Sequence, residues 1–154
     1  MDRRDDLRSR LAQGRAALLA AIDRLTLEDW DRATSNPSWT AREILVHLSQ
    51  AEPGLLARMH RFLDGTSELR PGFDLNVWNT RQVAKNRNTD IAILVQSLSD
   101  SRPETLRFLD TLTEDQLDVR GWHASGREMS VMEMFDLMAS HEEAHAQDIL
   151  TARM

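Results

Sequence analysis

The chain's apolar side chains recur every three or four residues, and this helical period constrains the fold more than any other feature. In the first stretch, over residues 3–25, charged residues separate the apolar positions, as expected of an amphipathic helix. Continuous apolar–polar alternation, which would mark a strand, occurs nowhere in the sequence. The pattern therefore predicts an all-α protein. The apolar positions of the first helix are Leu7, Leu11, Leu18, Ile22 and Leu25.

A second helix is predicted to begin at a capping box. In this motif the Thr40 hydroxyl accepts the backbone N–H of Glu43, and the Glu43 carboxylate returns to the threonine N–H. The apolar stripe continues from there until Asp64 and Gly65 end the helix. Pro53 lies inside this helix and is expected to kink it, because proline lacks the backbone donor and its ring crowds the preceding turn.

The third helical region is predicted over residues 73–112. We expect an interruption or a new cap at residues 88–90, which read Asn-Thr-Asp, and a bend or restart at Pro103. Residues 113–129 follow as a loop with little periodicity.

The last helix is predicted to start at a second capping box, formed by Ser130 and Glu133, and to continue to the end of the chain. Four helices of this kind can bury their apolar faces against one another in a four-helix bundle. A length of 154 residues suits a single domain covering residues 1–154.

The composition excludes several classes of function. The chain has no cysteine, so it forms no disulfide and offers no thiolate ligand or cysteine nucleophile. Its net charge of -6 comes from 25 acidic and 19 basic residues that are interspersed, which argues against a nucleic-acid-binding face. The apolar runs are far shorter than the roughly 20 residues that span a bilayer. We expect a cytoplasmic protein that binds neither nucleic acid nor membrane.

The last helix carries the motif H-E-x-x-H, formed by His141, Glu142 and His145. In zinc peptidases two such histidines bind the metal and the glutamate activates water. Those enzymes usually take a third ligand from further downstream, but only nine residues follow His145 here and none fits that spacing. Glu142 also points about 100° away from His141 around the helix. A peptidase is therefore the least favoured interpretation.

A third histidine upstream suggests a different kind of metal site. His47 lies along the inward edge of the second helix, and His141 and His145 lie in the apolar stripe of the last one. A lone inward histidine is usually a hydrogen-bonded core residue, but three imidazoles in an apolar interior are best satisfied by one divalent ion. Zinc, nickel, iron and manganese all accept imidazole ligands. Of the remaining histidines, His60 is expected to be solvated and His123 lies in a loop from which it could reach a pocket.

Three stretches of the sequence, SWTAREILVHLSQAE, FDLNVWNTRQVAKNR and ASHEEAHAQDI, resemble the DinB-like superfamily of helical bundles. This superfamily, also described as YfiT-like metal-dependent hydrolases, includes mycothiol- and bacillithiol-dependent transferases and isomerases. The resemblance covers essentially the whole chain and implies a DinB/YfiT-like four-helix bundle. It also implies that His47, His141 and His145 bind the metal with water completing the coordination, and that the protein is a homodimer. We expect no second C-terminal domain of the kind that some thiol-dependent isomerases carry.

These observations predict a metal-dependent transferase or hydrolase that acts on a small molecule, with a low-molecular-weight thiol as a candidate co-substrate. Three neutral imidazoles leave the ion its full charge and an open position, as catalytic sites require. Trp78, Asn79 and Arg81 are expected to line the mouth of the substrate pocket. The alternative is a protein without enzymatic activity that binds a metal or a small molecule in stress response or self-protection.

Four other residues carry secondary expectations. Glu52 and Asp148 are candidate partners for the N–H groups of the metal-binding imidazoles. Trp39 and Trp122, each shortly before a capping box, are expected to cover the ends of the bundle.

Overall fold

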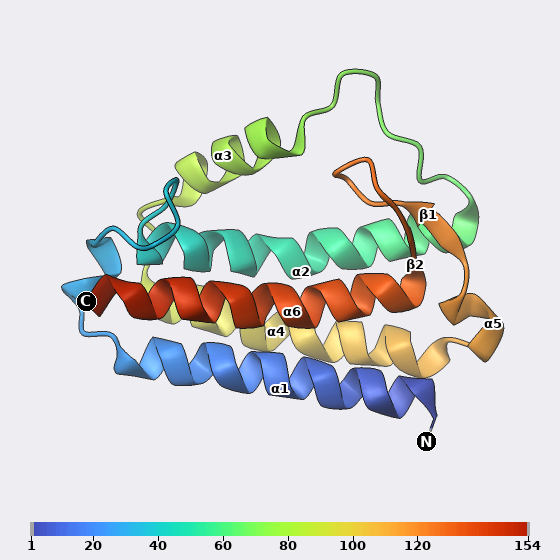
Figure 1. The fold of residues 1–154 in the computed structure, drawn as a ribbon, viewed down its shortest axis with the longest axis horizontal. Helices are drawn as coiled ribbons and strands as arrows, with labels where there is room; N and C mark the ends of the chain where they lie inside the picture. Colours follow the sequence, from blue (N-terminus) through green and yellow to red (C-terminus); the bar gives the residue numbers. More distant parts are fainter. Residues whose placement is uncertain (1, 154) are drawn as a thin grey trace.

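Four long helices form the body of the protein and lie side by side (Figure 1). The computed structural model describes residues 2–153. Shorter helices lie in the connections between the long ones, namely the 3-10 helix η1 (Asp29–Asp31), α3 (Leu75–Asn86) and α5 (Glu114–Leu117), and the 3-10 helix η2 (Thr151–Arg153) follows the last long helix. The four long helices are α1 (Arg3–Arg24), α2 (Ala41–Asp64), α4 (Ile91–Thr111) and α6 (Val131–Leu150).

The helix starts follow the local sequence signals. The Thr40 side chain accepts the N–H of Glu43, and the Glu43 carboxylate accepts the N–H of Thr40, so the predicted capping box is present. The same reciprocal pair, Ser130 with Glu133, caps α6. Gly65 ends α2 with a φ of 72°, a left-handed conformation that glycine adopts without strain.

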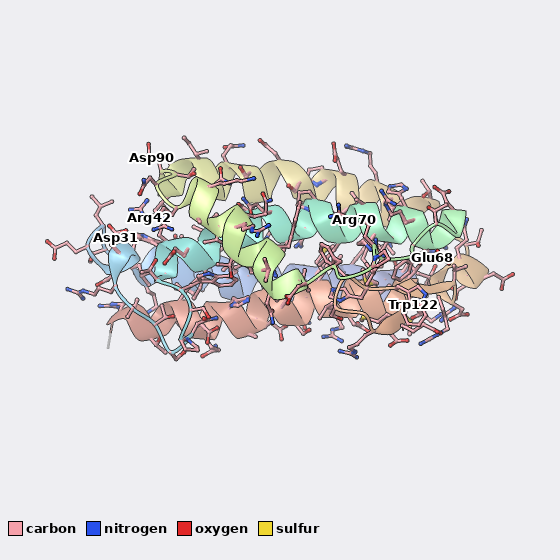
Figure 2. All side chains as sticks on the ribbon, turned by 90° about the horizontal axis from the view of Figure 1, so that it is seen from above. Asp31, Arg42, Glu68, Arg70, Asp90 and Trp122 are labelled. Atoms are coloured by element: carbon pink, nitrogen blue, oxygen red, sulfur yellow. The ribbon has the colours of Figure 1, made fainter. Side chains whose placement is uncertain are left out.

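The order of the helices requires one long connection. In Figure 1 α1 and α6 run in one direction, and α2 and α4 run in the other. Because α2 and α4 are parallel neighbours, no short turn can join them, and residues 65–90 return along the length of the bundle instead. Helix α3 lies in this connection and crosses obliquely over α2 (Figure 2).

The third helical region therefore differs from the expectation. It breaks in the predicted place, at residues 87–90, but only α4 belongs to the bundle, and α3 packs outside it. Arg42 helps to fix this corner, because it bonds both the Asp31 carboxylate and the backbone oxygen of Thr89. Helix α4 continues through Pro103, so of the bend or restart expected there the restart does not occur, and α2 likewise continues through Pro53 without ending.

The loop predicted over residues 113–129 contains regular structure. It forms α5 and an antiparallel hairpin of β1 (Arg120–Trp122) and β2 (Glu128–Ser130), in which Gly121 pairs with Met129. The hairpin was not predicted from the sequence, because three-residue strands are too short to show a period of two. Gly121 is required at this place, since a Cβ there would lie 2.4 Å from the Phe62 ring of α2.

Two apolar clusters fill the two halves of the bundle. Leu11, Met59 and Phe135 belong to the cluster near the hairpin, and Leu18 and Ile44 belong to the cluster at the opposite end. Between them each long helix contributes buried or partly buried polar side chains to one layer, which we call the charge layer. Its members are Arg15 of α1, Glu52 of α2, Arg102 and Thr105 of α4, and Glu142 of α6.

The charge layer is closely paired. Arg15 contacts both Glu52 and Glu142 at 2.9 Å, and Arg102 contacts the same two carboxylates at 3.1 and 3.0 Å. Thr105 donates its hydroxyl to Glu52 at 2.6 Å. Each arginine also donates to a backbone carbonyl, so the buried charges are neutralised and hydrogen-bonded together.

Among residues 2–153, no helix is both long and apolar enough to cross a membrane.

Candidate metal centre

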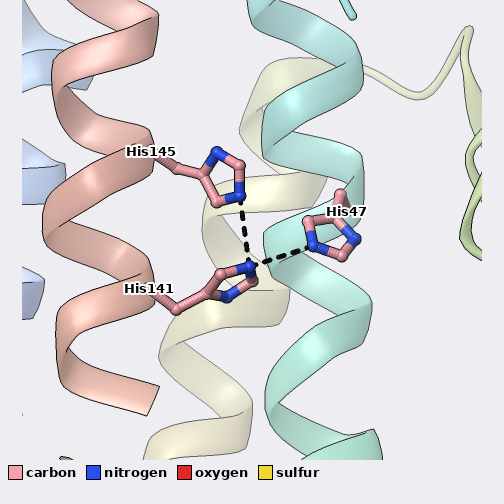
Figure 3. A group of neighbouring side chains, drawn as sticks. All are labelled: His47, His141 and His145. Atoms are coloured by element: carbon pink, nitrogen blue, oxygen red, sulfur yellow. Dashed lines mark hydrogen bonds between the residues drawn. The ribbon is translucent and has the colours of Figure 1, made fainter. Parts of the chain in front are cut away.

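Three histidine rings meet between α2 and α6 (Figure 3). His141 and His145 lie one helical turn apart on α6, so both project from the same face toward His47 on α2. The Nε2 atom of His141 lies 3.1 Å from Nε2 of His47 and 3.1 Å from Nε2 of His145. One nitrogen from each ring can be chosen so that all three lie within 4.8 Å of one another. The structure thus brings together the three residues that the sequence singled out.

The arrangement fits a divalent ion. With metal–nitrogen bonds of roughly 2.05 Å, neighbouring ligand atoms lie about 2.9 Å apart at right angles and about 3.4 Å apart in a tetrahedron. The His141 nitrogen lies at such a separation, 3.1 Å, from each of the other two nitrogens, and the three ligand atoms as a set lie within 4.8 Å of one another. Without an ion, the Nε2 atom of His141 can carry at most one proton, and it faces two other ring nitrogens. Hydrogen bonds between the rings can therefore satisfy the three nitrogens only in part. Three imidazoles with an open side are the donor set of catalytic rather than closed structural sites.

The rings are held in the neutral form that binds metals. Burial lowers the pKa of His47 to about 4, and the neighbouring charge of His145 acts in the same direction. Burial likewise lowers the pKa of His141 to about 3, with smaller contributions from the other histidines. Burial also lowers the pKa of His145, although the Asp148 carboxylate opposes that shift. At neutral pH these nitrogen lone pairs are therefore free to bind an ion.

Two neighbouring side chains orient the rings. The Asp148 carboxylate lies 3.2 Å from Nδ1 of His145, where it favours the tautomer whose Nε2 lone pair faces the other histidines. The Trp39 ring lies 4.8 Å from the His47 ring, centre to centre, so this tryptophan packs against the site. Asp148 is thus placed as its expected role requires. Glu52 was wrongly expected to serve an imidazole, because its carboxylate is taken up by the charge layer.

Glu142 does not face the three histidines. Its carboxylate accepts hydrogen bonds from Arg15 and Arg102, and the residue is only 4% exposed. The reason is the helical rotation of about 100° between His141 and Glu142, which turns the glutamate into the bundle. The H-E-x-x-H spelling therefore combines two site histidines with one structural glutamate.

A cavity of about 740 Å³ opens beside the histidines. His47 and His141 contribute to its wall, together with residues of α2, α3 and the hairpin. Trp78 and Asn79 line it, and Trp78 is 47% exposed. Arg81 is exposed and does not belong to the lining, because it lies roughly 100° around α3 from the inward face. Gln82, one residue later, takes the place that was expected for Arg81.

Three arginines of the cavity wall were not predicted from the sequence. Arg58, Arg61 and Arg70 line the cavity. His123, at the tip of the hairpin, also lines it, and Nδ1 of that ring accepts the backbone N–H of Ser125 at 3.1 Å. The available signal was the helical spacing of Arg58 and Arg61 from His47 along α2.

Trp122 and His60 also carried expectations from the sequence. Trp122 was expected to cover a bundle end, but its side chain is 42% exposed and its backbone oxygen accepts a hydrogen bond from Arg58. His60 is exposed, as expected, and its ring lies 4.4 Å from that of Phe108, centre to centre.

The protein is thus an α-helical bundle in which some neighbouring helices are parallel and others antiparallel. Three histidines converge beside a cavity in this bundle and form a candidate metal centre. The family follows from comparison with known proteins, because the model of the DinB superfamily matches residues 10–149. The chain belongs to the DinB superfamily.

Two relatives extend the comparison. The protein named putative metal-dependent hydrolase OB0413, from Oceanobacillus iheyensis, is 24% identical over 131 residues, which are 85% of this chain and 74% of that protein. YfiT from Bacillus subtilis has a solved structure, reported as a probable metal-dependent hydrolase with an unusual four-helix bundle topology. It matches 97% of this chain and 85% of its own with a TM-score of 0.80 at 20% identity, which establishes a shared fold. The four-helix bundle predicted from the sequence is thereby confirmed.

Proposed function

We propose that this protein is a metal-dependent enzyme that acts on a small molecule, as a hydrolase or as a transferase with a low-molecular-weight thiol co-substrate. The observation that carries the proposal is the convergence of three imidazole nitrogens within 4.8 Å of one another, with two of the rings, His47 and His141, in the wall of a 740 Å³ cavity. The names of the relatives, both of which refer to metal-dependent hydrolases, support the same class of activity.

His47, His141 and His145 are the proposed ligands, and zinc, nickel, iron or manganese is the proposed ion. A divalent ion on three neutral imidazoles supplies a Lewis acid and lowers the pKa of a bound water or thiol. Asp148 keeps the His145 ring in its binding orientation through the 3.2 Å contact at Nδ1. Trp78 and Asn79 are the proposed substrate-binding residues, and their position on α3 places an apolar surface and an amide at the cavity wall.

The thiol route is favoured by one feature of the sequence. The chain has no cysteine of its own, so no protein thiol competes for the ion or for an electrophilic substrate. We further propose a cytoplasmic homodimer. Light scattering of the purified protein tests the dimer, and fractionation of cells tests the location.

The enzymatic proposal is tested first by metal content and then by turnover. Purified protein is analysed for bound metal, reconstituted with each of the four candidate ions, and incubated with ester substrates or with a thiol and an electrophile. We expect about one equivalent of metal per chain and turnover that follows metal loading. His141→Ala should lose both, whereas His60→Ala, which changes an exposed histidine outside the site, should keep both.

The alternative function remains distinguishable in this experiment. A protein that holds one equivalent of metal but shows no turnover with either set of substrates would be a binding protein. A protein that fails to bind any of the four ions after reconstitution would overturn the metal centre itself.

A further inference from the structure

The cavity beside the histidines extends along one stripe of α2. His47, Gly54, Arg58 and Arg61 all line it, at spacings that keep them on the same side of the helix. With a rise of 1.5 Å per residue, Arg58 lies about 16 Å and Arg61 about 21 Å from His47 along the helix axis. The cavity thus has a histidine end and an arginine end.

The arginine end carries excess positive charge. Arg58 and Arg61 come from α2, and Arg70 comes from the segment between α2 and α3, which passes over the bundle near Trp122 (Figure 2). Glu68 is the single acidic residue of the lining. This concentration stands out in a chain whose net charge is -6.

Eight of the chain's 18 arginines form no ion pair among the described residues, and three of these eight line the cavity. The other ten form ion pairs within the described part of the molecule, as Arg42 does with Asp31. Arg58, Arg61 and Arg70 form none with any residue between positions 2 and 153. Their charges are therefore available to a ligand that enters the cavity.

Arg58 is held ready for such a ligand. One of its terminal nitrogens donates to the backbone oxygens of Ser67 and Trp122, so the guanidinium is fixed between the α2–α3 segment and the hairpin. Its Nε–H is buried and has no hydrogen-bond acceptor among the described residues, so a ligand oxygen reaches this donor only when the groups that cover it shift. A buried donor without an acceptor is costly, and such a group in a native structure calls for a partner. A carboxylate or phosphate oxygen is the strongest acceptor that an arginine can meet.

The wall between the two ends is largely apolar. Leu55 of α2 and Leu137 of α6 line it, and Phe73 and Trp78 close one side with their rings 6.2 Å apart, centre to centre. A ligand that fills this length would bury an apolar body there.

We propose that the cavity binds an elongated anionic substrate, in which a carboxylate or phosphate group sits at the arginine end and an apolar body lies along Leu55 and Trp78. This inference rests on the proposed function for one point only, which is that the reacting end of the substrate lies at His47 and His141. The anion-binding end is independent of metal and of turnover.

The test measures binding of simple probes to metal-free protein by calorimetry, so that no carboxylate can bind through an ion. Octanoate and octyl phosphate carry the anionic group, and 1-octanol and octylamine are the neutral and cationic controls of the same length. We expect at least one of the two anions to bind tenfold or more tightly than either control. Equal binding of all four probes, or no binding of either anion, would overturn the proposal.

Variants then locate the anion. Arg58→Gln and the double variant Arg61→Gln with Arg70→Gln should each weaken binding of the anion tenfold or more and leave octanol binding unchanged. Arg81→Gln, an exposed arginine of α3 outside the lining, is the matched control and should change affinity less than twofold. If Arg58→Gln does not fold, the double variant decides, because Arg61 and Arg70 are exposed.

The outcomes separate the two proposals. Loss of anion binding in the arginine variants, together with no metal-linked turnover, would support the anion site and contradict the enzyme. Anion affinity that is unchanged in the arginine variants would overturn the anion site, even if the metal-loaded protein turns over substrate.

Discussion

Replacement of Glu142 by glutamine tests whether the glutamate of the H-E-x-x-H motif acts in structure or in chemistry. The substitution keeps the size of the side chain and removes its charge. In the charge layer, Glu142 accepts hydrogen bonds from Arg15 at 2.9 Å and from Arg102 at 3.0 Å, and its side chain is 5% exposed. Glutamine leaves two buried guanidinium groups with the single carboxylate of Glu52, and its amide N–H groups meet other donors.

The expected cost follows from this pairing. Removal of one partner from a buried ion pair destabilises a protein by about 3–5 kcal/mol, because the remaining charge is left uncompensated. For 154 residues, an unfolding entropy of about 2.1 cal/mol/K per residue converts this cost into a decrease of about 10–15 °C in Tm. Metal affinity should stay within a few-fold of the parent protein, because the three imidazoles remain in place.

The assay combines urea unfolding, followed by circular dichroism, with metal titration of the folded variant. Glu143→Gln is the matched control, because Glu143 is the adjacent residue and forms no ion pair among the described residues. Its free energy of unfolding should change by less than about 0.5 kcal/mol. A Glu142→Gln variant with parental stability but without metal-dependent turnover would refute the structural interpretation and restore a catalytic one.

Three further predictions concern packing, the site and pH. Gly14→Ala should destabilise the protein by about 1–3 kcal/mol in urea unfolding, because its Cβ would lie 2.7 Å from a backbone oxygen of α6. Gly54→Ala, with no atom within 4 Å of the new Cβ, should instead stabilise it by about 0.5–1 kcal/mol, and equal effects at both positions would contradict the packing argument. Asp148→Asn should weaken metal binding about 10-fold to 100-fold in a competition titration, since the carboxylate orients His145, and unchanged affinity would remove that role. The pKa of Asp29 is lowered chiefly by a backbone hydrogen bond, so its stabilisation is complete above the unfolded pKa of about 3.9 and is lost as pH falls through the lower folded pKa. Asp29→Asn should therefore reduce stability at pH 6, the deficit should shrink below about pH 4, and a deficit that grows on acidification would show the sign to be wrong.

The sequence by itself determined the features that depend on neighbouring residues. The four apolar stripes predicted the long helices, and the capping boxes at Thr40 and Ser130 located the starts of α2 and α6. The spacing of His141 and His145 fixed their common direction, because residues one turn apart on a helix share a face. The same local geometry turned Glu142 away from them.

Only the tertiary structure decided what depends on distant residues. The 3.1 Å approach of His47 to His141 joins positions 94 residues apart, and no local interaction specifies it. The hairpin, the placement of α3 outside the bundle and the gathering of Arg58 and Arg70 at one end of the cavity also arise from the packing of remote segments. The charge layer has the same origin, since each of its side chains can be recognised as part of a network only when all four helices are in place.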